Sequence, residues 1–125
     1  AVRMMTGNRS DVLSTSLKED MSADQFAENF AELVKDFTAD DQVILLADIL
    51  SGSPFTNALN VLSDKGLISN TLIIAGMNMP LAITAVLMKD NFDDLAALKE
   101  VLLSEGRMGL TDFVVESNDD DEDDL

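Results

Sequence analysis

The sequence predicts an α/β fold: a doubly wound, mainly parallel central sheet with helices on both faces and a C-terminal antiparallel strand. Two apolar runs support this prediction, because residues 43–47 (VILLA) and 71–75 (TLIIA) have the short, uninterrupted pattern of buried parallel strands. Each run is followed by a turn signal and then by apolar residues at helical spacing. This alternation of strands and helices is typical of an α/β protein.

The composition indicates one domain without disulfide or thiolate chemistry. With 125 residues, 46% of them apolar, the chain is long enough for one core and too short for two ordinary domains. We assign residues 1–115 to the α/β domain and residues 116–125 to an acidic, disordered tail. The chain has no cysteine and no histidine, so it lacks the commonest general base, metal ligand and phosphoryl acceptor. We expect no metal and no cofactor.

The net charge of −16 narrows the choice of partners. Residues 116–125 (ESNDDDEDDL) contain seven acidic and no basic residues, so removing them leaves −9 on the rest. An acidic body argues against binding to nucleic acid or to an anionic membrane. It favours a basic protein partner.

The N-terminal third predicts a helix end, a strand and an amphipathic helix. Residues 1–5 resemble the end of a helix that residues 6–8 stop, so we expect a missing element upstream. Residues 12–17 (VLSTSL) can form a short strand. Ser22 and Gln25 form the S-x-x-Q capping box that opens a helix. The predicted buried face of this helix comprises Phe26, Phe30, Leu33, Val34 and Phe37.

The most informative segment follows the strand at residues 43–47. Asp48 stands at the carboxyl end of this strand, and a short turn (SGSP) follows at residues 51–54. Because serine is a favoured N-cap and proline suits a first helical turn, Ser53 is expected to cap a helix that begins at Pro54. Free N–H groups at a helix N-terminus attract anions, phosphate above all. The segment therefore predicts phosphate chemistry.

The C-terminal half predicts two helices and a last strand. Residues 76–79 form a turn, and a helix covers about residues 80–88. A further helix covers about residues 93–104 and is ended by Gly106, and residues 110–115 form the closing strand. The inward positions of the last helix are Leu95, Leu98, Val101 and Leu102.

One long uncharged stretch raises the question of a membrane span. No charged residue lies between Lys65 and Lys89, an interval long enough for a transmembrane helix. A strand, a turn and a buried helix explain it better, and we expect a cytoplasmic protein without direct membrane insertion. The polar and helix-breaking residues that interrupt the stretch are Asn70, Gly76, Asn78 and Pro80.

The two strands predict where a ligand would bind. In doubly wound sheets, ligands lie outside the carboxyl ends of strands where the strand order reverses. The loop at residues 48–53 and the turn at residues 76–78 both follow strands. If these strands are neighbours, both loops line one crevice.

Each motif also has a purely structural explanation. Asp48 could be a turn or N-cap residue, residues 51–54 a helix entry, Asn78 a turn residue and Pro80 a helix start. The turn lacks the lysine and the glycine spacing of a nucleotide P-loop. A serine hydrolase would need a histidine, and a magnesium phosphatase would need several strand-end carboxylates, of which only Asp48 is clearly so placed.

Two spaced motifs resemble the mannose-family IIA component of the bacterial phosphoenolpyruvate-dependent sugar phosphotransferase system. Residues 48–55 (DILSGSPF) are similar to the family pattern D-x-x-G-G-S-P-F, and residues 76–81 (GMNMPL) to G-x-N-x-P followed by M or L. The resemblance extends from residue 1 to about residue 115. Ser51 departs from it, since the family usually has glycine there.

The resemblance implies a phosphohistidine carrier. In this family, a histidine in the loop after the first strand accepts a phosphoryl group from the phosphocarrier HPr and passes it to a histidine of the IIB component. Because this chain has no histidine, the resemblance places the first strand, the histidine loop and most of the first helix upstream of residue 1. The chain as given would then be inactive. The alternative is a degenerate, non-catalytic homologue.

The resemblance also assigns roles to individual residues. Asp48 matches the aspartate that hydrogen-bonds the imidazole, and with Ser53 it would form the catalytic pair. The groups that would hold phosphoryl oxygens are Ser51, Gly52 and Ser53. The expected active-site loop contains Gly76, Asn78 and Pro80.

The assembly and the biological system follow only from the resemblance. Such IIA domains are typically homodimers that exchange their last strand, which here would be residues 110–115. Related domains occur in dihydroxyacetone kinase systems and in transcriptional regulators. Three alternatives therefore remain open: a phosphotransfer subunit of the dihydroxyacetone kinase type, a non-catalytic regulatory module, and an ordinary small-molecule-binding domain.

Overall fold

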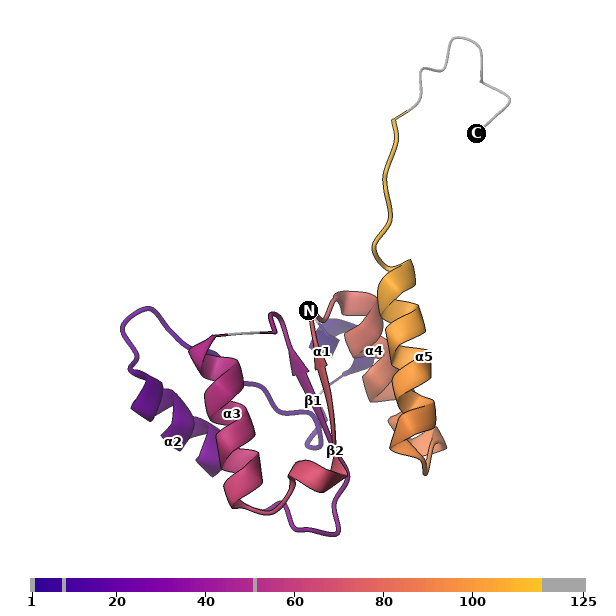
Figure 1. Cartoon of the computed structure of the whole chain (residues 1–125). Coiled ribbons are helices and arrows are strands. Elements are labelled where there is room, and N and C mark those ends of the chain that lie inside the picture. Colours follow the sequence, from indigo (N-terminus) through magenta and orange to yellow (C-terminus); the bar gives the residue numbers. More distant parts are fainter. Residues whose placement is uncertain (1, 8, 51, 116–125) are drawn as a thin grey trace, which may run out of the picture.

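Two parallel strands and the helices around them form the body of the protein (Figure 1). The computed structural model describes residues 2–7, 9–50 and 52–115. Short 3₁₀ turns, η1 (Ile68–Asn70) and η2 (Lys89–Asn91), precede β2 and follow α4. The helices and strands in chain order are α1 (Val2–Thr6), α2 (Ala23–Leu33), β1 (Val43–Ala47), α3 (Ser53–Asp64), β2 (Thr71–Ala75), α4 (Met79–Met88) and α5 (Leu95–Met108).

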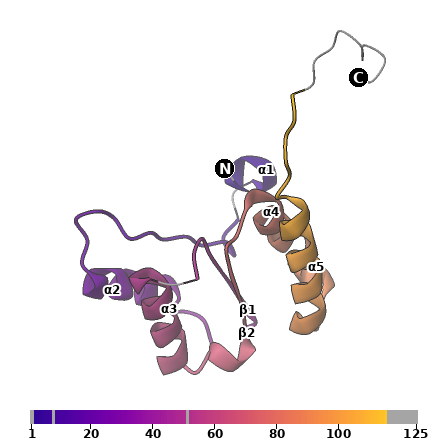
Figure 2. The same cartoon turned by 45° about the horizontal axis from the view of Figure 1, so that its top comes forward.

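The two predicted strands are confirmed at both ends and lie side by side. β1 pairs with β2 in parallel, with Val43 opposite Thr71 and Ala47 opposite Ala75. Helices cover both faces of the pair, α2 and α3 on one and α4 and α5 on the other, as Figures 1 and 2 show. Within the described residues the sheet has two strands. The mixed α/β class is therefore confirmed, and the larger doubly wound sheet stays a prediction.

A first apolar core joins α2, α3 and one face of the sheet. Phe26 and Phe30 of α2 stack with ring centroids 6.4 Å apart and pack with the fully buried Leu62 of α3. Leu45 of β1 extends this cluster to the sheet. The predicted cap at Ser22 is confirmed, because its hydroxyl accepts a hydrogen bond from the Gln25 N–H at 3.1 Å. The Gln25 side chain donates to Asn29 instead of returning to Ser22, so only half of the capping box forms.

A second core joins β2, α4 and α5, and it corrects the predicted end of the last helix. Leu98 and Leu102 of α5 are buried against Leu72 and Ile74 of β2. The prediction that Gly106 ends the helix is wrong, because α5 continues to Met108. A Cβ at Gly106 would lie 2.8 Å from Leu81 Cδ1, so the glycine allows α4 and α5 to approach closely.

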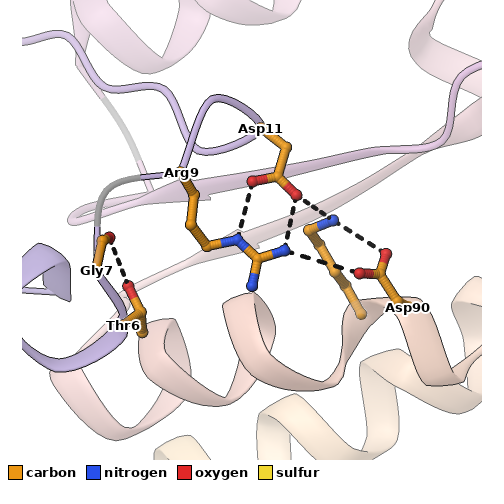
Figure 3. A network of polar contacts seen from close by, with 6 residues as sticks. Thr6, Gly7, Arg9, Asp11 and Asp90 are labelled. Carbon is orange, nitrogen blue, oxygen red and sulfur yellow. Dashed lines mark hydrogen bonds and ion pairs between the residues drawn. The ribbon is translucent and has the colours of Figure 1, made fainter.

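The helix end predicted near the start of the chain is confirmed as α1, which contacts α4. Gly7 follows it with a φ of 83°, a conformation that stops a helix. A polar network then fixes the chain to the end of α4 (Figure 3). Asp11 accepts a two-pronged contact from Arg9 and lies 2.8 Å from Lys89 Nζ, while Arg9 also contacts Asp90.

Two predicted strands are not formed in the single chain. The strand prediction for residues 12–17 is wrong: these residues are exposed and have no partner strand among the described residues, and an extended segment without a partner has no ladder hydrogen bonds. Residues 110–115 also form no strand here and lead away from α5 (Figures 1 and 2). The predicted acidic tail at residues 116–125 lies outside the described residues.

Candidate functional site

The loops after β1 and β2 meet at one edge of the sheet. Because the strands are parallel and in register from Val43 to Ala47, Asp48 and Gly76 leave the sheet at the same level. The N–H of Met77 donates to the carbonyl of Ala47 at 3.0 Å, which fixes the second loop to the end of the first strand. The predicted convergence of the two loops is confirmed.

A cavity of about 500 Å³ opens at this edge. Asp48 and Gly76 bring the two strand ends to it, and Lys99 and Leu103 contribute from α5. Two of its lining side chains are charged, those of Asp48 and Lys99. The apolar part of its lining comprises Ile49, Leu50, Ile73, Ile74, Ala75 and Leu103.

Asp48 is one of the two charged residues that line the described part of this cavity. It is exposed and directly follows the last residue of β1. The N-cap of α3 is Gly52, so Asp48 is not the residue that caps the following helix. No hydrogen bond or ion pair within the described ranges engages its carboxylate. The structural explanation of Asp48 as an N-cap is thereby removed, and Asp48 lines the cavity.

The N-terminus of α3 differs from the predicted cap. Ser53 is the first residue of the helix, and Gly52, with a φ of 109°, occupies the N-cap position that was predicted for Ser53. Gly52 has no side chain to accept the first N–H groups, and among the described residues no side-chain cap is present. Ser53 is exposed and Pro54 has no N–H to offer. The helix thus begins with donors that its own cap leaves unsatisfied, as an anion site requires. Ser51 lies outside the described residues.

Asn78 and Pro80 of the predicted active-site loop have structural roles. The Asn78 side chain caps α4 by accepting from the Leu81 N–H at 3.1 Å, and it donates to the Gly106 carbonyl at 2.8 Å. A Cβ at Gly109 would lie 2.7 Å from Pro80 Cγ, so Pro80 packs closely against the end of α5. Neither residue lines the cavity, and neither do Gly52 and Ser53. Gly76, with a φ of 77°, does line it and makes the turn that leaves β2.

The comparison with protein families agrees with this arrangement. Residues 1–102 match the sequence profile of the family EIIA-man, described as "PTS system fructose IIA component". The chain belongs to this family. The match includes β1 and β2, both loops at the sheet edge and most of α5. The resemblance of the two sequence motifs to this family is therefore confirmed.

Two solved structures have a similar fold. The phosphotransferase system component EIIA from Streptococcus agalactiae matches this IIA chain with a TM-score of 0.74 at 20% identity, over 90% of this chain and 83% of that one. The PTS IIA protein associated with the fucose utilization operon of Streptococcus pneumoniae matches with a TM-score of 0.70 at 23% identity. This second match covers 89% of this chain and 79% of the other. At these identities the similarity is one of fold.

Lys99 is the residue at the site that the sequence analysis missed. It belongs to α5, far from both motifs in sequence, and only the packing of α5 on β2 brings it to the cavity. The sequence does hold one signal for it. Lys99 follows Leu98 and lies one turn before Leu102 and Leu103, so it borders the apolar face by which the helix packs on the sheet.

The described part of this IIA chain shows neither a metal-binding cluster nor a membrane span. None of its groups of acidic side chains is arranged to hold a metal ion. Within the same residues, every helix is too short or too polar to cross a bilayer.

Proposed function

We propose that this chain is the IIA component of a sugar phosphotransferase system and acts in the cytoplasm as a phosphohistidine carrier. It takes the phosphoryl group from HPr and delivers it to the IIB component. The observation that carries the proposal is the convergence of two family motifs at one sheet edge, where Asp48 faces a cavity. Membership of the IIA family supports it.

The reaction requires a histidine from outside these 125 residues, because the sequence contains none. The imidazole nitrogen of that histidine attacks the phosphorus atom. A phosphorus–nitrogen bond forms as the bond between phosphorus and the donor's nitrogen breaks, and the donor leaves with the electron pair and takes up a proton. The second transfer, to IIB, repeats the exchange with this protein as donor.

Asp48 orients the accepting imidazole in this proposal. A carboxylate that accepts from one ring nitrogen fixes the tautomer, so that the other nitrogen carries the attacking lone pair. It also stabilises the imidazolium character that develops during attack. The exposed position of Asp48 at the end of β1 leaves room for a ring next to it.

The start of α3 holds the phosphoryl oxygens. The N–H groups at Gly52 and Ser53 and the Ser53 hydroxyl are donors at a helix N-terminus, with Ser51 next to them in the chain. Phosphoryl transfer depends mainly on positioning and charge stabilisation, so a few fixed donors are sufficient. Gly76 keeps its place in the active-site loop because it lines the cavity. Asn78 and Pro80 act indirectly, by fixing α4 against α5.

A homodimer with exchanged C-terminal strands completes the proposal. Leu110, Phe113 and Val115 expose 88%, 84% and 82% of their surface in the single chain, and exposed apolar side chains gathered in one segment mark an interaction site. β2 is paired only with β1 among the described residues, which leaves its other edge available to an antiparallel strand.

The decisive experiment is transfer of label from phosphoenolpyruvate. The protein at the length that its cell makes is incubated with phosphoenolpyruvate, enzyme I and HPr. It should acquire a label that acid removes, because a phosphoramidate is acid-labile. The 125-residue chain serves as the control and should acquire none. Stable labelling of a serine in the 125-residue chain would overturn the assignment.

The absence of histidine from the 125 residues favours a second candidate. A IIA-like module without the acceptor would bind partners and sense their phosphorylation state without chemistry. Failure of the cellular protein to take label, together with retained binding to HPr or IIB, would establish this candidate instead.

A further inference from the structure

The cavity at the sheet edge has an unexpected charge balance. The chain carries a net charge of −16, and Asp48 adds a negative charge to the cavity itself. Of the described residues that line it, Lys99 is the basic one. Any anion that binds next to Asp48 needs a cation close by, since two like charges a few ångströms apart repel by about 1 kcal/mol even in water.

The backbone of Lys99 is held in place by its neighbours in α5. Leu98 and Leu102 are 1% and 0% exposed, so this turn of the helix is anchored against β2. Leu103, one turn after Lys99, lines the same cavity. The lysine therefore leaves the helix at a fixed point at the edge of the cavity.

Among the described residues, no carboxylate pairs with the ammonium group of Lys99. The ion pairs in the described part of the chain involve Arg9, Lys35 and Lys89, and none involves Lys99. Lys99 and Asp48 thus line one cavity without pairing with each other. An anion that binds in this cavity would be repelled by the Asp48 carboxylate and attracted by the Lys99 ammonium group.

We propose that Lys99 is a phosphoryl-binding residue, whose ammonium group contacts the equatorial oxygen atoms that move with the phosphorus, in the cavity that it shares with Asp48. This inference rests on the proposed function and adds a third element, α5, to the site. Lys99 would offset part of the charge that accumulates when a phosphoryl group lies next to the Asp48 carboxylate.

A solvated surface lysine is the competing explanation, and phosphate titration separates the two. Inorganic phosphate is added to the 125-residue chain, labelled with ¹⁵N, and amide shifts are followed by NMR. We expect shifts at residues 48–50 and 76–77 around the cavity and at Gly52 and Ser53 at the start of α3. Lys99→Gln should weaken binding by about 2- to 5-fold, the scale of an exposed charge pair, and Lys99→Arg should restore it.

The controls make the result specific. Lys18→Gln removes an equal charge from an exposed loop that does not line the cavity, and it should bind phosphate like the parent. Asp48→Asn should bind phosphate more tightly, because it removes the repulsion. Equal weakening by Lys99→Gln and Lys18→Gln would overturn the proposal, as would the absence of shifts around the cavity.

This titration is independent of the labelling test. If Lys99→Gln binds phosphate as tightly as the parent, the role of this lysine is refuted, even if the cellular protein is labelled on a histidine. Conversely, phosphate binding that depends on Lys99 in a protein that takes no label would leave the anion site standing and refute the carrier function.

Discussion

At the scale of single residues, the fold separates Asp48 from the other motif residues. Asn78 caps α4 and bonds the Gly106 carbonyl, and Pro80 packs against Gly109, so both stabilise the helix pair. Asp48 does none of this: it is exposed, it caps no helix and it faces the cavity. A polar residue at a strand end without a structural partner is a candidate for chemistry.

Asp48→Asn tests this separation directly. The substitution keeps the shape and removes the charge that orients the imidazole, so phosphoryl transfer in both directions should fall by about 10² or more. The melting temperature should hardly change, because the described residues give Asp48 no structural partner. Asn78→Ala is the matched control, since it should lower the melting temperature through loss of the cap. A large loss of stability in Asp48→Asn with normal transfer would favour a structural role.

The network around Asp11 predicts a dependence of stability on pH. The hydrogen bond from Arg9, and then that from Lys89, holds the pKa of Asp11 well below its usual range. A carboxyl group with a lowered pKa in the folded state stabilises the fold above its unfolded pKa of about 4 and loses this contribution as the pH falls toward the folded pKa. The free energy of unfolding of the parent should therefore exceed that of Asp11→Asn above about pH 4, and this difference should shrink as the pH falls below about 4.

Urea unfolding of both proteins at pH 7 and pH 3 measures this. The advantage of the parent should be small, because Asp11 is exposed to solvent. Asp112→Asn serves as the control, as this exposed carboxylate has no cation partner in the described structure. A gap between the parent and Asp11→Asn that is the same at both pH values would contradict the prediction.

At the scale of elements, local sequence patterns predicted the strands whose apolar pattern is their own. They did not predict features that depend on packing against another element. The runs at residues 43–47 and 71–75 gave both strands, because a buried parallel strand is apolar along its whole length. Their adjacency, which brings Asp48 and Gly76 together, was a conditional prediction that the register confirms. Residues 12–17 have strand-like composition and form no strand, since pairing depends on a second strand.

The helix boundaries also differ from the prediction where packing or backbone conformation, and not local composition, determines them. Gly106 has the appearance of a stop signal, but its lack of a side chain serves the contact with Leu81 of α4. Ser53 was a reasonable N-cap by composition, yet Gly52 takes that place with a positive φ. Lys99 could not be assigned to the site from its own surroundings, because the packing of α5 on β2 determines what it faces.

Gly106→Ala measures the close contact of α4 and α5. Alanine favours a helix by about 1 kcal/mol over glycine, but its Cβ would lie 2.8 Å from Leu81 Cδ1. Leu81 is only 3% exposed and has little room to move, so overpacking of about 1–3 kcal/mol should offset or exceed the gain.

Urea denaturation gives the change in unfolding free energy. Ser104→Ala, at an exposed position of the same helix, provides the gain in helix propensity without the contact and should be stabilising by a few tenths of a kcal/mol. If Gly106→Ala stabilises the protein by more than Ser104→Ala does, the glycine is not required by packing.

At the scale of the whole molecule, the exposed C-terminal segment is the feature that a single chain leaves unexplained. Beyond α5, residues 110–115 run away from the body (Figure 2). Four large apolar side chains of this segment are exposed, those of Leu110, Phe113, Val114 and Val115. Phe113 and Val115 lie on the same side of an extended segment and could cover one face of a sheet edge. Exchange between two chains buries these side chains and pairs the second edge of β2 without any change in the body of either protomer.

Two truncations distinguish exchange from an inert extension. Removal of residues 116–125 takes away seven acidic residues and none of the apolar ones, so the protein should remain a dimer in light scattering. Removal of residues 110–125 keeps the whole of α5 but deletes the exchanged segment, and the unpaired edge of β2 should then give a misfolded or aggregating protein. Phe113→Asp in the full chain should weaken the dimer in the same direction, whereas Thr111→Asp should have less effect because a smaller polar side chain is replaced. A folded, well-behaved monomer after removal of residues 110–125 would refute exchange, because it would show that the body needs no strand from a second chain.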